Sequence, residues 1–260
     1  MKKIVTKFGG SSLADAGQFR KVKDILLLDE ARQYVIPSAP GRRFKDDDKV
    51  TDLLYRCHKQ KSAGEDYQDT FDLIAARYMD IAEELGLHVD LGAALDEVNE
   101  KIDAGANADY CASRGEYLNG LLLADFLGWR FMDAAEAVKF TADGAFDAET
   151  TNTLMAEKLS DGVPTVVPGF YGSYPDGTIK TFSRGGSDIT GALAAAALDA
   201  LQGALQLGAE LVVADGLEHK VERVDLIPAD GILCHVGDEH EHHIRVLPAD
   251  ALRRRHTAEL

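Results

Sequence analysis

The first 28 residues of the chain have the order strand, glycine turn, helix. Lys3 to Phe8 is a short run of β-branched and aromatic residues typical of a buried strand, and Gly9-Gly10-Ser11-Ser12 follows it. From Ala14 to Leu28 apolar residues recur at a helical spacing. Such a unit places backbone N–H groups around phosphate oxygens. It is not a Walker loop, because the lysine, Lys7, precedes the glycines.

The same alternation continues along most of the chain. Further strands are predicted at residues 33–41, 129–134, 163–170 and 179–182. Further helices are predicted at residues 49–58, 110–127 and 150–159, and after the glycine pair 185–186 through the alanine-rich run 191–200. This order indicates an α/β fold with a mostly parallel sheet covered on both faces. Ligands of such sheets bind at the carboxyl ends of the strands.

Two amphipathic helices, at residues 67–85 and 91–102, interrupt the alternation. We expect them to form a helical insertion over about residues 63–107 that serves as a lid or an oligomer surface. Ahead of them, Asp46, Asp47 and Asp48 form an acidic run. Such runs are usually solvated, so we predict no metal site there.

Length and charge restrict the classes of partner. A chain of 260 residues, 45% apolar and 28% charged, can bury a large core as one domain or two lobes. Because its net charge is −16, we do not expect nucleic acid or anionic membranes as partners. Three scattered cysteines suit a reducing cytoplasm, and we expect neither a signal peptide nor a membrane-spanning segment, because no apolar run approaches 18 residues.

A glycine-rich stretch, Phe182 to Gly191, combines Arg184, Ser187 and Asp188 around the glycine pair. An arginine can hold a planar anion with two parallel hydrogen bonds, and an aspartate can hold an ammonium group or a metal. The stretch therefore fits a pocket for a small zwitterion or a phosphate, or else a surface turn that caps a helix. Lys7 likewise has two interpretations. It either contacts a phosphoryl group or is a solvated lysine at the end of a strand.

Glu116 follows Ser113-Arg114-Gly115 near the predicted start of the helix at 110–127. In a first helical turn a carboxylate either complements the helix dipole or binds a positively charged amine, and the spacing alone favours the dipole.

In the tail, His235, His240, His242 and His243 lie among acidic residues. Zinc needs three or four converging ligands, so a solvated hairpin tip is favoured over a metal site.

Five motifs resemble those of the aspartate kinases of the amino-acid kinase superfamily. They cover about residues 3–200 and read Lys7-Phe8-Gly9-Gly10-Ser11-Ser12, Ser38-Ala39-Pro40-Gly41, Ser113-Arg114-Gly115-Glu116, Pro168-Gly169-Phe170-Tyr171-Gly172 and Ser183-Arg184-Gly185-Gly186-Ser187-Asp188. The resemblance implies a three-layer α/β/α sandwich around a mostly parallel sheet. It also implies phosphorylation of the side-chain carboxylate of L-aspartate by ATP and Mg²⁺, the first step toward lysine, threonine and methionine.

The resemblance assigns roles to individual residues. Lys7, with Gly9, Gly10 and Ser11, would contact the phosphoryl group, and Asp188 would orient Lys7 or the substrate amine. Arg184 would clamp a substrate carboxylate, and Glu116 would pair with the α-ammonium group. The same pocket would be lined by Ser38, Thr51, Phe170 and Ser187.

Residues 201–260 depart from the family pattern. The family's nucleotide segment is echoed only faintly by Val212-Val213-Ala214-Asp215-Gly216. We therefore expect a substrate-binding lobe over residues 1–200, an atypical or truncated nucleotide region over 201–260, no regulatory domain, and a homo-oligomer. The alternatives are a diverged, non-catalytic homologue that keeps the amino-acid pocket, and another carboxylate or carbamate kinase of the superfamily.

Overall fold

The computed structural model describes residues 3–183, 185–203, 209–214, 222–225, 231–238 and 241–248, with side-chain surroundings for 3–183 and 185–198. Six strands form the main sheet in the order β3-β4-β2-β1-β7-β8. They are β1 (Lys3–Phe8), β2 (Arg32–Pro37), β3 (Arg130–Phe131), β4 (Thr165–Val166), β7 (Ala209–Ala214) and β8 (Glu222–Asp225). All neighbours pair in parallel except β7 and β8, which are antiparallel. The predicted α/β class and mostly parallel sheet are confirmed.

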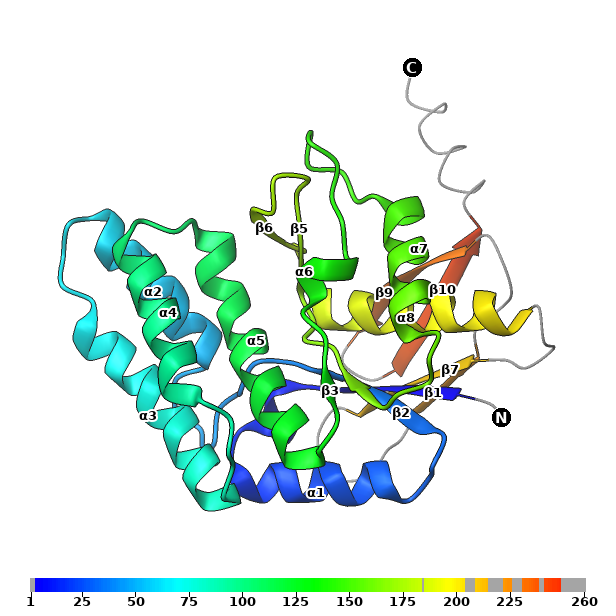
Figure 1. Cartoon of the computed structure of the whole chain (residues 1–260), viewed down its shortest axis with the longest axis horizontal. Helices are drawn as coiled ribbons and strands as arrows, with labels where there is room; N and C mark the ends of the chain where they lie inside the picture. Colours follow the sequence, from blue (N-terminus) through cyan, green and yellow to red (C-terminus); the bar gives the residue numbers. More distant parts are fainter. Residues whose placement is uncertain are drawn as a thin grey trace.

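Helices cover both faces of this sheet. Alternate residues of β2 enter different cores, because successive side chains of a strand point to opposite faces. Val35 belongs to the core beneath α1 (Ala16–Leu27), α2 (Val50–Ser62), α3 (Gln68–Leu85), α4 (Leu91–Asp103) and α5 (Ala108–Leu127). Tyr34 and Ile36 belong to the core with α6 (Ala134–Ala137), α7 (Ala148–Leu159) and α8 (Gly186–Gly203). The three-layer sandwich follows from this alternation (Figure 1).

The helix ends follow local sequence signals. Asp15, Asp90, Asn107 and Asp147 each accept a hydrogen bond from a backbone N–H in the first turn of α1, α4, α5 and α7. Gly86 and Gly128, with φ of 65° and 67°, end α3 and α5 in the left-handed conformation that favours glycine. The two predicted inserted helices are present, and their apolar faces pack into the first core.

Two predicted strands are shorter than expected. The predicted strand 163–170 contains only β4, which lies between Pro164 and Pro168, and proline cannot donate to a strand ladder. The strand predicted at 129–134 is reduced to β3. After Phe170 the chain turns into β5 (Tyr171–Ser173), which pairs with β6 (Ile179–Thr181) as a separate antiparallel hairpin.

Two further expectations are corrected. Because α5 begins at Ala108, Glu116 lies more than two turns inside the helix and not in its first turn, so it does not complement the helix dipole. The acidic run is not uniformly solvated, because Asp47 is buried.

In the tail, β9 (Gly231–Asp238) and β10 (Glu241–Pro248) form an antiparallel hairpin. The structure does not describe the side chains of the tail histidines. Asp215 and Gly216 lie outside the described residues.

Candidate active site

An ion pair joins the end of β1 to the start of α8. Lys7 Nζ lies 2.9 Å from Asp188 Oδ1, and the side chains are 7% and 36% exposed. Lys7 is one of the buried residues of β1, while Asp188 lies in the first turn of α8, which begins at the second glycine of the pair. The beginning of the chain and the 185–188 region are therefore in contact, as the sequence motifs require.

The loops that follow β1 and β2 pack backbone against backbone. Gly41 N donates to Gly10 O at 2.8 Å, and Ser38 N donates to Phe8 O at 3.0 Å. A Cβ added to Gly10 would lie 2.7 Å from Ala39 O, so only glycine allows this approach. Gly9 precedes the short 3-10 helix η1 (Gly10–Leu13), and Ser11 within it is exposed.

Glu116 lies under the second of these loops and is 5% exposed. It accepts a hydrogen bond from Ala39 N–H, while its Oε2 has no partner among the described protein atoms. Burial raises the pKa of Glu116 to about 8, and Lys7 and Arg114 oppose this rise only partly. A buried carboxylate with an unpaired oxygen favours a cationic ligand, because an added positive charge would stabilise its ionised form.

Gly115 allows α5 to pack against the same loop. A Cβ at Gly115 would lie 2.7 Å from Ala39 Cβ and 3.7 Å from Thr51 Oγ1. Thr51 occupies the first turn of α2, so α2, α5 and the 38–41 loop meet at this glycine. Ser38 is also held by α5, because Asn119 Nδ2 donates to Ser38 O at 2.6 Å.

Phe170 and Ser187 lie where the chain after β4 meets α8. A Cβ at Gly169 would lie 2.6 Å from Ser187, and a Cβ at Gly186 would lie 2.7 Å from Phe170 Cα. Phe170 has φ of 80°, the one positive φ of a non-glycine residue in the part of the chain that the structure describes. Such a conformation is unfavourable for a bulky residue and often marks a functional position.

Arg114 was given no role by the sequence analysis. Its guanidinium lies 4.7, 4.4 and 5.1 Å from the ring centres of Tyr110, Tyr117 and Tyr171, and it is 6% exposed. The spacing of Tyr110, Arg114 and Tyr117 along one helix is a signal that the sequence offers, but Tyr171 comes from β5. Burial raises the pKa of Glu116, and the buried positive charge of Arg114 partly lowers it, in addition to the effect of Lys7.

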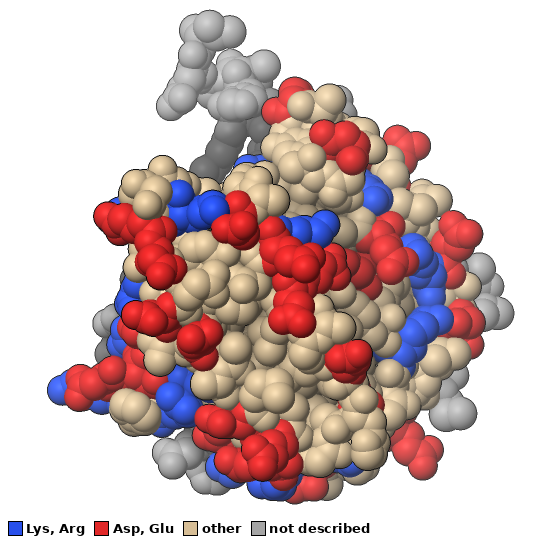
Figure 2. Space-filling view, turned by 60° about the vertical axis from the view of Figure 1, so that its left-hand side comes forward, with Lys and Arg blue, Asp and Glu red and all other residues tan. Residues whose placement is uncertain are grey.

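The structure thus brings together Lys7, Gly10, Ser38, Thr51, Glu116, Phe170, Ser187 and Asp188 through direct contacts or shared neighbours. Arg184 lies outside the described residues. Acidic side chains spread over the face shown in Figure 2, so an anionic ligand depends on local positive charge such as Lys7.

The described residues also bear on membranes and metals. None of their helices is long and apolar enough to span a membrane. They also contain no group of three or more histidine, cysteine, aspartate or glutamate side chains placed to hold a metal ion.

Comparison with known proteins gives consistent results. Residues 2–205 match the amino acid kinase family. The chain is 35% identical over 213 residues to Aspartokinase 3 of Bacillus subtilis, covering 75% of this chain and 46% of that protein. Among solved structures it is similar to Clostridium acetobutylicum aspartate kinase, with 49% identity and a TM-score of 0.74 over 76% of this chain and 46% of that one.

A second solved structure is Escherichia coli aspartokinase III in complex with lysine and aspartate. It is 26% identical, with a TM-score of 0.67, and the match covers 76% of this chain and 47% of that chain. The present chain therefore spans about half the length of these relatives.

Proposed function

The chain belongs to the amino acid kinase family, and we propose that it transfers the γ-phosphoryl group of ATP to the side-chain carboxylate of L-aspartate. The similarity to aspartate kinases supports this substrate. The observation that carries the proposal is the Lys7–Asp188 ion pair together with the buried Glu116, whose Oε2 has no partner among the described protein atoms and whose pKa, raised by burial, is lowered in part by the charge of Lys7. A cation for a phosphoryl group and an anion for an ammonium group are the two charges that this reaction needs.

The chemistry requires positioning more than proton transfer. A free aspartate side chain has a pKa of about 3.9, so it is ionised at neutral pH and needs no general base. The protein must then hold two anions in line and stabilise the charge on the γ-phosphoryl oxygens. Lys7 with the amides of Gly9 and Gly10 would bind these oxygens, and Ser11 would border them. The positive N-terminal end of α8 adds a favourable field.

The substrate's amino-acid group would bind on the other side. Glu116 would pair with the α-ammonium group, and Arg184 would hold a carboxylate through two parallel hydrogen bonds. Four residues, Ser38, Thr51, Phe170 and Ser187, would line the pocket. Asp188 would keep the Lys7 ammonium group directed toward the phosphoryl group, since the two side chains already form an ion pair.

We propose Mg²⁺ as the companion of ATP. Magnesium in kinases is typically bound by one or two carboxylates together with phosphate oxygens and water. The described residues fit this mode, because they offer the exposed part of Asp188 and not a cage of three acidic ligands. When bound, Mg²⁺ would neutralise phosphate charge.

The biological setting follows from the same proposal. Formation of 4-phospho-L-aspartate would serve lysine, threonine and methionine biosynthesis. We place it in the cytoplasm, since Cys57 and Cys111 are free and buried, which suits a reducing compartment. Assembly into a homo-oligomer is proposed from the resemblance alone.

A hydroxylamine assay tests the proposal directly. The full chain is incubated with ATP, Mg²⁺, L-aspartate and hydroxylamine, which traps an acyl phosphate as a hydroxamate. We expect aspartyl hydroxamate that depends on both ATP and aspartate. Aspartate binding without turnover would favour the non-catalytic homologue, and turnover only with glutamate or another acid would favour a different carboxylate kinase.

A further inference from the structure

Two consecutive residues of α3 donate hydrogen bonds to the backbone of two different parts of the site. Arg77 Nη1 donates to Gly41 O at 3.0 Å, and Tyr78 Oη donates to Gly115 O at 2.6 Å. Neighbouring residues of a helix point about 100° apart, so one turn of α3 can reach both the 38–41 loop and α5. Arg77 is 4% exposed and Tyr78 is fully buried.

The guanidinium of Arg77 is fixed by Asp47. Arg77 Nη2 donates to Asp47 Oδ2 at 2.6 Å, while Arg43 donates to the same carboxylate from its backbone N at 2.9 Å and its Nε at 3.0 Å. The hydrogen bond from the Arg43 side chain is the largest cause that holds the pKa of Asp47 well below its usual range. Asp47 therefore stays charged, and it orients the fork of Arg77 toward Gly41.

The two carbonyl groups belong to residues next to the proposed ligand groups. Gly41 N donates to Gly10 O, which follows Lys7 and Gly9 in the chain. Gly115 precedes Glu116, which accepts from Ala39 N–H in the same loop as Gly41. α3 thus donates one hydrogen bond to the loop that contains Ala39 and another to Gly115, the residue before Glu116.

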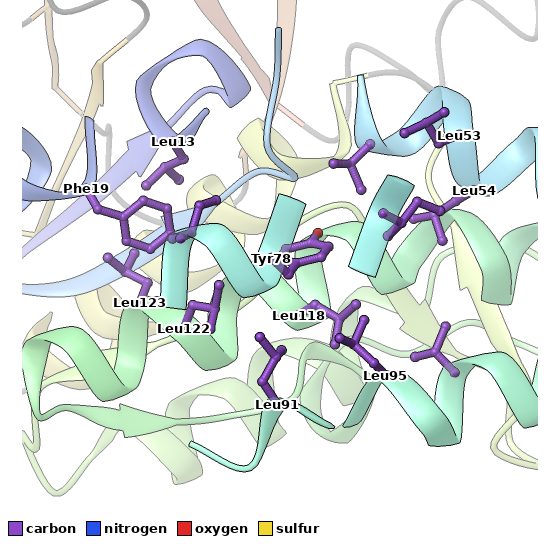
Figure 3. Packing of buried hydrophobic residues seen from close by; sticks show 14 of the residues in the cluster. Leu13, Phe19, Leu53, Leu54, Tyr78, Leu91, Leu95, Leu118, Leu122 and Leu123 are labelled. Atoms are coloured by element: carbon purple, nitrogen blue, oxygen red, sulfur yellow. The ribbon is translucent and has the colours of Figure 1, made fainter. Parts of the chain in front are cut away.

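We propose that Arg77 and Tyr78 are positioning residues that set the separation between the 38–41 loop and Glu116, and so the fit of the amino-acid substrate. The inference rests on the proposed function, in which this loop and Glu116 bind aspartate. The helical insertion then acts as a fixed support of the site through α3. Figure 3 shows that Tyr78 also packs among apolar side chains such as Leu118, so a purely structural role is the competing explanation.

Variants that keep the packing separate the two explanations. Tyr78→Phe removes only the hydroxyl group, and Arg77→Lys keeps the positive charge next to Asp47 but loses the planar fork that serves two acceptors. For each we expect the KM for aspartate to rise about tenfold, which corresponds to about 1.4 kcal/mol. The KM for ATP and the kcat should stay within about threefold of the wild type.

Matched controls come from the same helical region. Tyr67→Phe removes a buried tyrosine hydroxyl that donates to Asn99 O, away from the site, at 3.2 Å. Arg56→Lys changes an arginine whose ion pair with Asp48 is exposed. Both controls should keep the wild-type KM. If Tyr78→Phe and Tyr67→Phe lower the melting temperature alike and neither changes the KM, the positioning role is overturned.

A second measurement keeps the inference testable if the wild type does not phosphorylate aspartate. Hydrogen–deuterium exchange of peptides covering residues 38–41 and 113–116 should be faster in Arg77→Lys and Tyr78→Phe than in Tyr67→Phe. Equal exchange rates in all three variants would show that α3 does not hold the 38–41 loop and residues 113–116 in place, which overturns the inference. Absence of hydroxamate from the wild type, with faster exchange in the two variants, would instead reject the proposed phosphorylation of aspartate and leave the support by α3 in place.

Discussion

Lys7 Nζ and Asp188 Oδ1 lie 2.9 Å apart, although Lys7 lies near the end of the first strand of the chain and Asp188 lies in the first turn of α8. The lysine is nearly buried and the aspartate is about one-third exposed. A buried ammonium group without a partner would be strongly destabilising, so Asp188 makes it possible to keep a charged lysine at this position. Lys7 therefore provides a positive charge that Asp188 orients and that water only partly screens.

Lys7→Ala should lower turnover more than it weakens substrate binding. The lysine would act on charge that spreads over the γ-phosphoryl oxygens in the transition state, and removal of one such donor typically lowers kcat by about 10²–10³-fold. Steady-state kinetics of hydroxamate formation measures both constants. Leu73→Ala, which changes an exposed side chain of α3, is the control. An equal loss in kcat and in aspartate affinity would count against the phosphoryl role.

The stability of the ligand-free protein should fall as pH rises between about 4.5 and 8. The folded-state pKa of Glu116 is raised to about 8 from 4.5, so the folded protein retains a proton that the unfolded chain has lost. The contribution of Glu116 to the free energy of unfolding is fully present below its pKa in the unfolded chain. This contribution is lost as the pH rises through its pKa in the folded protein. At 1.36 kcal/mol per pH unit the full loss is roughly 5 kcal/mol at most.

Denaturant unfolding at pH 5 and pH 8 checks this dependence. Glu116→Gln removes the titrating group and keeps the side-chain shape, so its stability should change less between the two pH values. A wild type and a Gln variant with the same pH dependence would show that Glu116 does not titrate in this range.

Aspartate binding at pH 7 should release close to one proton per site. The free site holds Glu116 mostly protonated, and an α-ammonium group placed beside it would lower its pKa and expel the proton. Calorimetric titration in two buffers with different ionisation enthalpies measures this number. Binding whose apparent enthalpy is the same in both buffers would contradict the pairing of Glu116 with the ammonium group.

The sequence predicted the features that depend on local pattern. The strand of Lys3–Phe8, the glycine loop after it and the long amphipathic helices are visible because their periodicity lies within one segment. The burial of Asp47 could not be predicted in this way, because it depends on Arg77 at a distance of 30 residues along the chain. The cage around Arg114 likewise needs Tyr171 from another element.

Glu116 shows how a small error in a helix boundary changes a functional interpretation. The sequence pattern of the helix 110–127 predicts that it opens with Ser113-Arg114-Gly115-Glu116, which puts Glu116 in its first turn, where a carboxylate interacts with the helix dipole. Asn107 caps the helix and starts it at Ala108, so Glu116 lies in the buried interior. The motif around Glu116 indicated a role in binding. The burial and the raised pKa of Glu116 could not be predicted from the motif, because they result from the packing of α5 against the 38–41 loop.

Gly169→Ala should uncouple α8 from the site. A Cβ at Gly169 would lie 2.6 Å from the Cα, Cβ and Oγ atoms of Ser187, so either the chain after β4 or the start of α8 must move. Movement of α8 displaces Asp188 from Lys7, and overpacking of this kind destabilises a protein by about 1–3 kcal/mol. We therefore expect lower stability together with a loss of kcat.

Gly92→Ala is the matched control for this substitution. Gly92 lies in α4, and a Cβ there would meet only Asp90 Oδ1, at 3.7 Å. Alanine in a helix is favoured over glycine by up to about 1 kcal/mol, so this variant should be as stable as the wild type or more stable, with unchanged kcat. Denaturant unfolding and the hydroxamate assay compare the two. If Gly169→Ala kept the wild-type kcat, close packing of the residue 169 backbone on Ser187 would not be needed to hold Asp188 against Lys7.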